Sequence, residues 1–174
     1  MPDDSEQHRR KSIRLKEYDY SSAGWYFVTI CVQKRECVLG HVSKGDAVLS
    51  QIGRTVRECW EWLPQQYPYV DLDECVIMPN HLHGIIIIND NRRKGGSRTA
   101  PTEVKSLGGL IGAFKTVSTK RVRQEYGSYA GPLWQRSYYE HVIRNDADLI
   151  RIRQYIINNP ACWDTDEENP ENFG

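Results

Sequence analysis

The sequence has no apolar segment long enough to cross a membrane. Its longest apolar runs, residues 25–32 and 84–88, are well short of the about 20 residues that a membrane-spanning helix needs. The chain also opens with charged residues instead of the apolar region of a signal peptide. We therefore expect no membrane partner and a cytoplasmic location.

The sequence also lacks a pattern of paired cysteines. It has five cysteines, an odd number, and no two of them are separated by only two residues. This arrangement indicates neither a disulfide framework nor a zinc finger. We expect reduced cysteines that lie in the core. They are Cys31, Cys37, Cys59, Cys75 and Cys162.

The chain has no excess of charge of either sign, since 23 lysines and arginines balance 23 aspartates and glutamates. The basic residues are nevertheless clustered, because residues 92–123 hold nine of them against a single acid, Glu103. Such clustering is typical of a surface that binds a polyanion, although charge alone does not separate it from an ordinary solvated surface. The candidate DNA-binding residues are Arg92, Arg93, Lys94, Arg98, Lys105, Lys115, Lys120, Arg121 and Arg123.

The residues that are present suit one globular domain. The chain has 174 residues, of which 39% are hydrophobic and 26% are charged, as in ordinary soluble domains. We expect a polar N-terminal arm over residues 1–24, one domain over residues 25–163 and an acidic tail over residues 164–174. The tail carries charge opposite to that of the basic cluster and could lie over it in competition with DNA.

Hydrophobic patterning predicts an alternation of strands and helices. Strand-like runs cover residues 25–32, 70–78, 81–88 and 133–143, and the middle two are joined by a turn at Pro79-Asn80. Apolar residues recur at helical spacing after the N-cap Ser50 and again from Leu107. A last helix begins at the N-cap Asn145 and is limited by Pro160. The order β-α-β-β-α-β-α predicts an α+β fold, a ferredoxin-like antiparallel sheet with helices packed on it.

Two pairs of residues carry chemistry. His81 and His83 are two apart in a strand, so their imidazoles point to one face about 7 Å apart along the strand and one cation can bridge them. Tyr155 and Asn159 are four apart in the last helix and share a helical face. Each pair has an ordinary alternative: histidine is common in strands without metal, Tyr155 can be a half-buried aromatic residue, and Asn159-Pro160 can simply end the helix.

Several motifs, in this order, resemble a known family. They are MPNHLHGIIII, SLGGLIGAFKTVSTKRVR, WQRSYYEHVI and NDADLIRIRQYIINNP, together with the N-terminal RKSIRLKEYDYSSAGWYFVTICVQKRE. The sequence resembles the REP-associated tyrosine transposases, a branch of the single-tyrosine HUH transposases, over roughly residues 10–163. The resemblance implies a ferredoxin-like domain of the HUH endonuclease type that cuts single-stranded DNA near an imperfect hairpin.

The resemblance also assigns roles to the two pairs. It implies that His81 and His83 hold a divalent cation, that Asn159 is a third ligand, and that Tyr155 is the nucleophile that forms a 5′-phosphotyrosine bond. We expect the cation to be Mg²⁺ or Mn²⁺, since histidine ligands suit manganese and the resemblance to the family implies magnesium. The expected partner is single-stranded hairpin DNA, and the enzyme can be a monomer or a homodimer.

Two other functions remain possible. In a metal-dependent hydrolase the histidines would help to activate water, but no HExxH motif accompanies them and Tyr155 would have no role. A protein derived from a transposase could instead bind hairpin DNA without cutting it. The presence of all four residues of the two pairs argues against such a loss of activity.

Overall fold

The structure is a computed structural model that describes residue 19 and residues 22–90, 104–127 and 131–172. Most of the predicted N-terminal arm lies outside these residues. So do Arg92, Arg93, Lys94 and Arg98 of the predicted DNA-binding set. No helix in the described part of the chain is long and apolar enough to span a bilayer.

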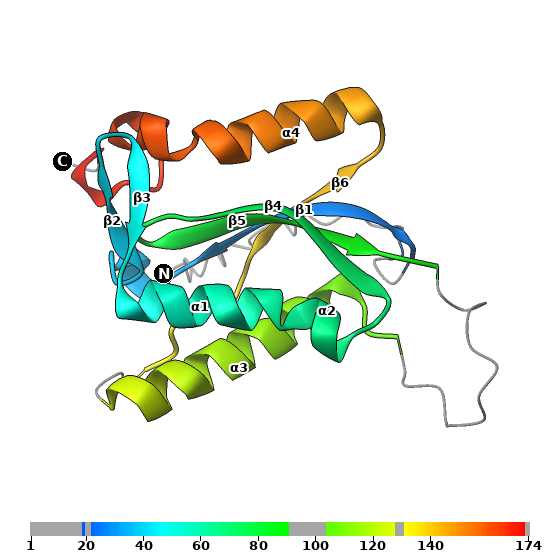
Figure 1. Cartoon of the computed structure of the whole chain (residues 1–174), viewed down its shortest axis with the longest axis horizontal. Helices are drawn as coiled ribbons and strands as arrows, with labels where there is room; N and C mark the ends of the chain where they lie inside the picture. The colour runs from blue at the N-terminus through cyan, green and yellow to red at the C-terminus, as the bar shows by residue number, and fades with distance from the viewer. Residues whose placement is uncertain (1–18, 20–21, 91–103, 128–130, 173–174) are drawn as a thin grey trace, which may run out of the picture.

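One antiparallel sheet of four strands organises the molecule, in the order β4-β5-β1-β6. Its strands are β1 (Gly24–Cys31), β4 (Val70–Ile77), β5 (His81–Ile88) and β6 (Tyr139–Ile143). The helices are α1 (Gln51–Glu61), α2 (Leu63–Gln66), α3 (Leu107–Tyr126) and α4 (Asp146–Asn158). Helices α1, α2 and α3 cover one face of the sheet and α4 lies across the other (Figure 1). The β-α-β-β-α-β order of these elements, with α4 added, confirms the predicted ferredoxin-like fold.

The central strands are buried because helices cover both faces of the sheet. Ser50 caps α1 as predicted, since its Oγ accepts the backbone N–H of Gly53 at 3.0 Å. Trp60 of α1 packs directly on the backbone of Gly84 in β5, where an added Cβ would lie 2.5 Å from the indole Cζ2. Glycine at this position therefore sets how closely α1 approaches the sheet.

A smaller core fixes α4 to the opposite face. Ile152 and Ile156 of α4 are buried against Phe27, Ile85 and Ile143 of the sheet. These side chains form an apolar stripe that anchors the last helix to the sheet. Buried apolar contacts hold the position of α4, and the polar face of the same helix is left for the site.

The hairpin of β2 (Gly40–Ser43) and β3 (Asp46–Leu49) was not predicted. Its two-residue turn, Lys44-Gly45, has positive φ at both positions, 53° and 81°. This is the backbone that matches the twist of a tight hairpin. Lysine is an uncommon residue in such a turn, so the sequence signal was weak. Short 3₁₀ helices at Gln33–Arg35, Pro160–Thr165 and Pro170–Asn172 were also not predicted.

Two predictions about the domain are wrong. The predicted strand 133–143 is regular only from Tyr139, because Trp134 forms an isolated bridge to Val32 and the carbonyls of residues 135–137 accept hydrogen bonds from Lys115 instead of joining a ladder. The cysteines are not all in the core, since Cys37 and Cys162 are exposed. Cys59 is buried as predicted.

Candidate active site

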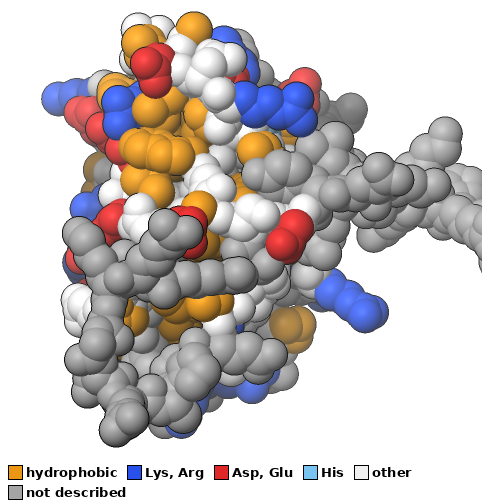
Figure 2. Space-filling view, turned by 90° about the vertical axis from the view of Figure 1, so that its right-hand side faces the viewer, with side chains coloured by type: hydrophobic (Ala, Val, Ile, Leu, Met, Phe, Trp, Pro, Cys, Tyr) orange, Lys and Arg blue, Asp and Glu red, His pale blue; other side chains and the backbone are white. Residues whose placement is uncertain are grey.

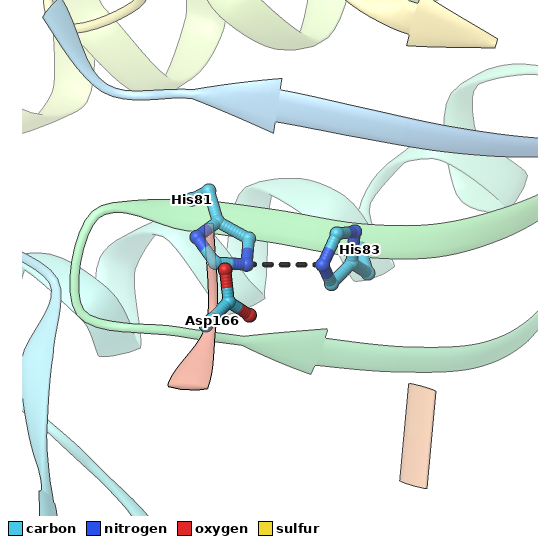
Figure 3. Close-up of side chains that lie close together, drawn as sticks. All are labelled: His81, His83 and Asp166. Atoms are coloured by element: carbon cyan, nitrogen blue, oxygen red, sulfur yellow. Dashed lines mark hydrogen bonds between the residues drawn. The ribbon is translucent and has the colours of Figure 1, made fainter. Parts of the chain in front are cut away.

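The register of the sheet places the candidate site on the α4 face. His81 pairs with Cys31 and His83 with Thr29 across the β1–β5 ladder. Because directly opposed residues of an antiparallel pair point to the same side, both imidazoles face α4. Their Nε2 atoms converge to 3.0 Å, much closer than the spacing along the strand (Figure 3). The two histidines share one face of the sheet, as predicted, and that they share one cation stays a prediction.

Each histidine is held through its other ring nitrogen. The Asn80 amide Nδ2 donates to the backbone carbonyls of Arg35 and Glu168 at 3.2 and 2.7 Å, so its Oδ1 faces His81 Nδ1 at 2.9 Å. Since an amide oxygen can only accept, His81 carries its proton on Nδ1 and leaves an Nε2 lone pair for the site. Thr29 Oγ1 lies 2.8 Å from His83 Nδ1 and can accept a hydrogen bond from an Nδ1–H in the same way. Such outer partners orient histidines that bind metals.

Both imidazoles are deeply buried, His81 at 0% and His83 at 3% exposure. Burial lowers the pKa of both rings below the usual histidine value, because the charged form loses its hydration. His81 lowers the pKa of His83 further, while Asp166 opposes the shift at His81. The rings are therefore neutral at neutral pH, and neutral imidazole is the form that ligates metals.

Helix α4 brings Tyr155 to the histidines. Its Oη lies 3.4 Å from His83 Nε2, and its ring packs at 83° against Phe27 with 6.0 Å between centroids. The side chain is 49% exposed, so the phenol is accessible from solvent. Burial of the remainder, followed by the charge of Asp166, raises the pKa of Tyr155, whereas the Asn159 side chain lowers it. The phenol is accordingly protonated unless positive charge is brought near it.

Asn159 lies at the end of α4 and still faces the site. Although Pro160 follows, its backbone is helical (φ −57°, ψ −42°), and the residue is 3% exposed. Its Oδ1 is buried and accepts no hydrogen bond from the described residues. Most buried amide oxygens in proteins have a partner, so this atom has free capacity for a ligand.

Asp166 is a site residue that the sequence did not predict. Its carboxylate comes from the segment after the 3₁₀ helix Pro160–Thr165, and ligand atoms of His81, His83 and Asp166 all lie within 4.8 Å of one another (Figure 3). One carboxylate oxygen, Oδ1, accepts the backbone N–H of Glu168 at 2.7 Å. The carboxylate and the amide oxygen of Asn159 are ligands that suit Mn²⁺ or Mg²⁺, and the two neutral imidazoles complete a mixed nitrogen and oxygen set that favours Mn²⁺ of the two.

A cavity of about 620 Å³ adjoins these groups. Tyr155 and His83 line it. Its acidic lining residues, Asp166, Glu167 and Glu168, come from the segment after α4, whereas His141 comes from β6, before α4, and Arg151 from the first half of α4. The acidic residues belong to the predicted tail. Within the described residues the tail lies against the end of the sheet that carries Asn80 and His81, where Glu168 pairs with Arg35 at 3.2 Å, and not over α3.

The predicted basic residues on α3 lie away from this cavity, on the opposite face of the sheet (Figure 1). Lys115 Nζ donates to three backbone carbonyls, and burial lowers its pKa to about 8. Arg121 is paired with Glu58 and Glu125. Lys105, Lys120 and Arg123 are exposed, although Arg123 also donates to the carbonyl of Gly131.

The chain is similar to known proteins over most of its length, although no family model matches it. An uncharacterized protein of Haemophilus influenzae is 40% identical over 171 residues, which cover 92% of this chain and 93% of that protein. A second Haemophilus influenzae protein, named for the REP-associated tyrosine transposases, is 27% identical over 143 residues, or 82% of this chain and 73% of that protein. A solved REP-associated tyrosine transposase bound to a REP hairpin shares the fold, with a TM-score of 0.55, 19% identity, and coverage of 85% of this chain and 72% of that one.

Proposed function

We propose that the chain belongs to the REP-associated tyrosine transposases and is a metal-dependent nuclease and strand transferase that acts on single-stranded hairpin DNA in the cytoplasm. Tyr155 is the proposed nucleophile. His81, His83, Asp166 and Asn159 are the residues that would hold the divalent cation, Mg²⁺ or Mn²⁺. A hairpin is proposed as substrate because the solved family member with this fold is bound to one.

A cation at this site would neutralise the charge of the scissile phosphate and make its phosphorus more electrophilic. The chain's own residues supply the remaining requirements. Asn80 and Thr29 fix the two imidazoles through Nδ1, and Phe27 fixes the ring of Tyr155 by an edge contact. The phenol oxygen is thus held beside the ligand atoms before DNA arrives, which reduces the entropy cost of the reaction.

In the proposed reaction the Tyr155 oxygen attacks phosphorus and loses its phenolic proton to solvent. The bond between phosphorus and the 3′ oxygen breaks, and that oxygen takes up a proton to become a free 3′ hydroxyl. The 5′ phosphate stays attached to Tyr155. Because a phosphodiester replaces a phosphodiester, the bond energy is kept, and a second 3′ hydroxyl can attack the phosphotyrosine to rejoin the strand.

The observation that carries this proposal is the distance of 3.4 Å between Tyr155 Oη and His83 Nε2. The Nε2 atom of His81 lies 3.0 Å from that same His83 nitrogen. A simple hydrolase does not require a tyrosine at that place. All the proposed groups come from one chain, so the reaction does not need a second copy. The exposed Lys105, Lys120 and Arg123, with Arg92, Arg93, Lys94 and Arg98, are the proposed contacts to the hairpin backbone.

The test is to incubate the protein with end-labelled hairpin DNA and Mn²⁺ or Mg²⁺ and to look for a covalent adduct on a denaturing gel. Tyr155→Phe removes one oxygen and should abolish both cleavage and the adduct, while hairpin binding stays within about twofold. Tyr139→Phe is the matched control, since Tyr139 is 43% exposed and lines the same cavity. An adduct that persists in Tyr155→Phe would refute the assignment, and hairpin binding without any adduct would favour a DNA-binding protein.

A further inference from the structure

Strand β6 places two more side chains on the α4 face. Tyr139 pairs with Thr29 and His141 with Phe27, so both point to the same side of the sheet as His83. Both residues line the cavity that contains Tyr155. Strand β6 lies at the edge of the sheet, and the proposed catalytic reaction gives neither side chain a role.

The Tyr139 ring is exposed but firmly positioned. It is 43% exposed, and it meets Phe27 edge-on at 67° with 6.2 Å between centroids. Phe27 also contacts the rings of His83 and Tyr155, at 5.5 and 6.0 Å. One buried phenylalanine therefore sets the relative positions of the candidate metal ligand, the candidate nucleophile and Tyr139. An exposed aromatic ring held in this way can stack on a flat ligand at little cost in side-chain entropy.

Beside this ring, the carboxylate of Asp148 contacts both His141 and Arg151. Asp148 Oδ2 lies 2.7 Å from His141 Nε2, and its Oδ1 accepts from Arg151 at 2.6 Å. Asp148 is itself fixed at the start of α4, where its backbone N–H donates to the N-cap oxygen of Asn145. Arg151 remains 70% exposed, so its guanidinium keeps donors for a further anion. Seen from the end at which α4 begins, the described surface carries basic, acidic and apolar side chains interspersed (Figure 2).

The part of the cavity lining that comes from the segment after α4 is acidic. It includes Asp166, Glu167 and Glu168, and their charges repel phosphates. A single strand that brings one phosphate to Tyr155 therefore meets less repulsion where His141 and Arg151 line the cavity. The combination of an exposed aromatic ring with an arginine is the arrangement that binds single-stranded nucleic acid.

From these contacts we propose that Tyr139, His141 and Arg151 form a nucleotide subsite next to the cleavage position. One base of the single strand stacks on Tyr139, and the phosphate beside it contacts the guanidinium of Arg151, while His141 helps to fix the Asp148 carboxylate that orients Arg151. This inference rests on the proposed function, because it defines the path of the strand that Tyr155 would cut. It adds a binding role to residues that neither hold the cation nor attack phosphorus.

Photocrosslinking tests the stacked base directly. Single-stranded DNA of mixed sequence, with 5-iodouracil in place of thymine, is bound to the full-length protein, irradiated and mapped by peptide mass spectrometry. Tyr139 should carry crosslinks. Tyr139→Leu should lose them and bind the strand about 10-fold more weakly, as expected for one stacked base, whereas Tyr139→Phe keeps the ring and should bind as the wild type does.

Salt dependence tests the phosphate contact. Arg151→Gln should reduce the slope of log affinity against log salt by about 0.7, the value for one phosphate contact on a single strand. Arg144→Gln removes the same charge from an exposed position that does not line the cavity, and should leave the slope unchanged.

The outcomes separate this inference from the proposed function. An adduct on Tyr155 without crosslinks on Tyr139 overturns the subsite and leaves the nuclease in place. Crosslinks on Tyr139 without any adduct support the subsite in a protein that binds DNA without cutting it. Equal affinity of Tyr139→Leu and the wild type, with Tyr139→Leu folded by circular dichroism, also overturns the stacking role.

Discussion

The side chain of Asn159 allows a quantitative test of the proposed metal centre. Its Oδ1 is buried and accepts no hydrogen bond from the described residues. A buried acceptor without a partner costs about 1–3 kcal/mol, and a bound cation would remove that cost. Two replacements of similar size change the site in opposite directions. Asn159→Leu removes the oxygen, whereas Asn159→Asp turns the amide into a carboxylate in the cavity that Asp166 also lines.

The expected effects follow from linkage between binding and folding. At a cation concentration 100 times the wild-type Kd, binding stabilises the fold by about 2.7 kcal/mol, or about 5–11 °C in Tm for a chain of this size. An outer partner of a metal is worth about 10–100-fold in affinity, and a direct ligand at least as much. At the same concentration Asn159→Leu should therefore gain only about 0.4–1.4 kcal/mol, or about 1–6 °C.

Asn159→Asp should change the metal-induced shift in Tm in the opposite direction to Asn159→Leu. Its carboxylate should bind the cation more tightly than the amide does, and the metal-induced shift should exceed that of the wild type. With chelator present it should be the least stable of the three proteins, because a buried charge then has no counter-ion.

Thermal melts with chelator and with a titration of Mn²⁺ or Mg²⁺ measure these shifts, and calorimetry gives Kd. Asn158→Leu is the control, since Asn158 is the exposed neighbour on α4. Equal metal-induced shifts for Asn159→Leu and the wild type would refute the assignment of Asn159 as a ligand.

Three further predictions concern neighbouring contacts. His83→Ala should abolish the metal-induced shift and also lower Tm with chelator present, because the buried imidazole stacks on Phe27, and melts measure both effects. Asn80→Ala should weaken Mn²⁺ binding about 10–100-fold by calorimetry, since it frees the orientation of His81. Arg153 donates two hydrogen bonds to Asp73 at 2.7 and 2.6 Å, and these lower the pKa of Asp73. A double-mutant cycle in urea should give a coupling of about 1 kcal/mol that is present above the ordinary carboxyl pKa and lost as pH falls through the lowered value.

Much of the fold could be predicted because its local signals agree with each other. Residues 70–78 and 81–88 are rich in apolar and β-branched residues and are joined by Pro79-Asn80, and the observed hairpin has these two strands. The shared face of His81 and His83 follows from strand periodicity alone. The helix of Tyr155 has a polar cap at one end and proline at the other, so its bounds are also local properties.

The remaining features depend on contacts between segments far apart in the chain. Asp166 lies in an irregular acidic segment, and nothing in its sequence indicates that the carboxylate returns to His81. Counting charges overestimated the basic surface for a similar reason. Lys115 and Arg121 are two of its nine members, yet their charged groups are bonded to carbonyls and to Glu58 within the fold. Only the tertiary structure distinguishes a basic residue that binds phosphate from one that joins two segments.

The acidic part of the cavity lining gives the cation a second role in the proposed mechanism. Two like charges 4 Å apart repel by about 4 kcal/mol at an effective dielectric constant of 20, and Asp166, Glu167 and Glu168 line the cavity into which the scissile phosphate must come. A divalent cation held by Asp166 would offset that repulsion as well as polarise the phosphate. The hairpin itself would bind outside this cavity, through exposed basic residues. Removal of the metal should therefore lower the affinity for the strand at the cleavage position far more than it lowers the affinity for the hairpin.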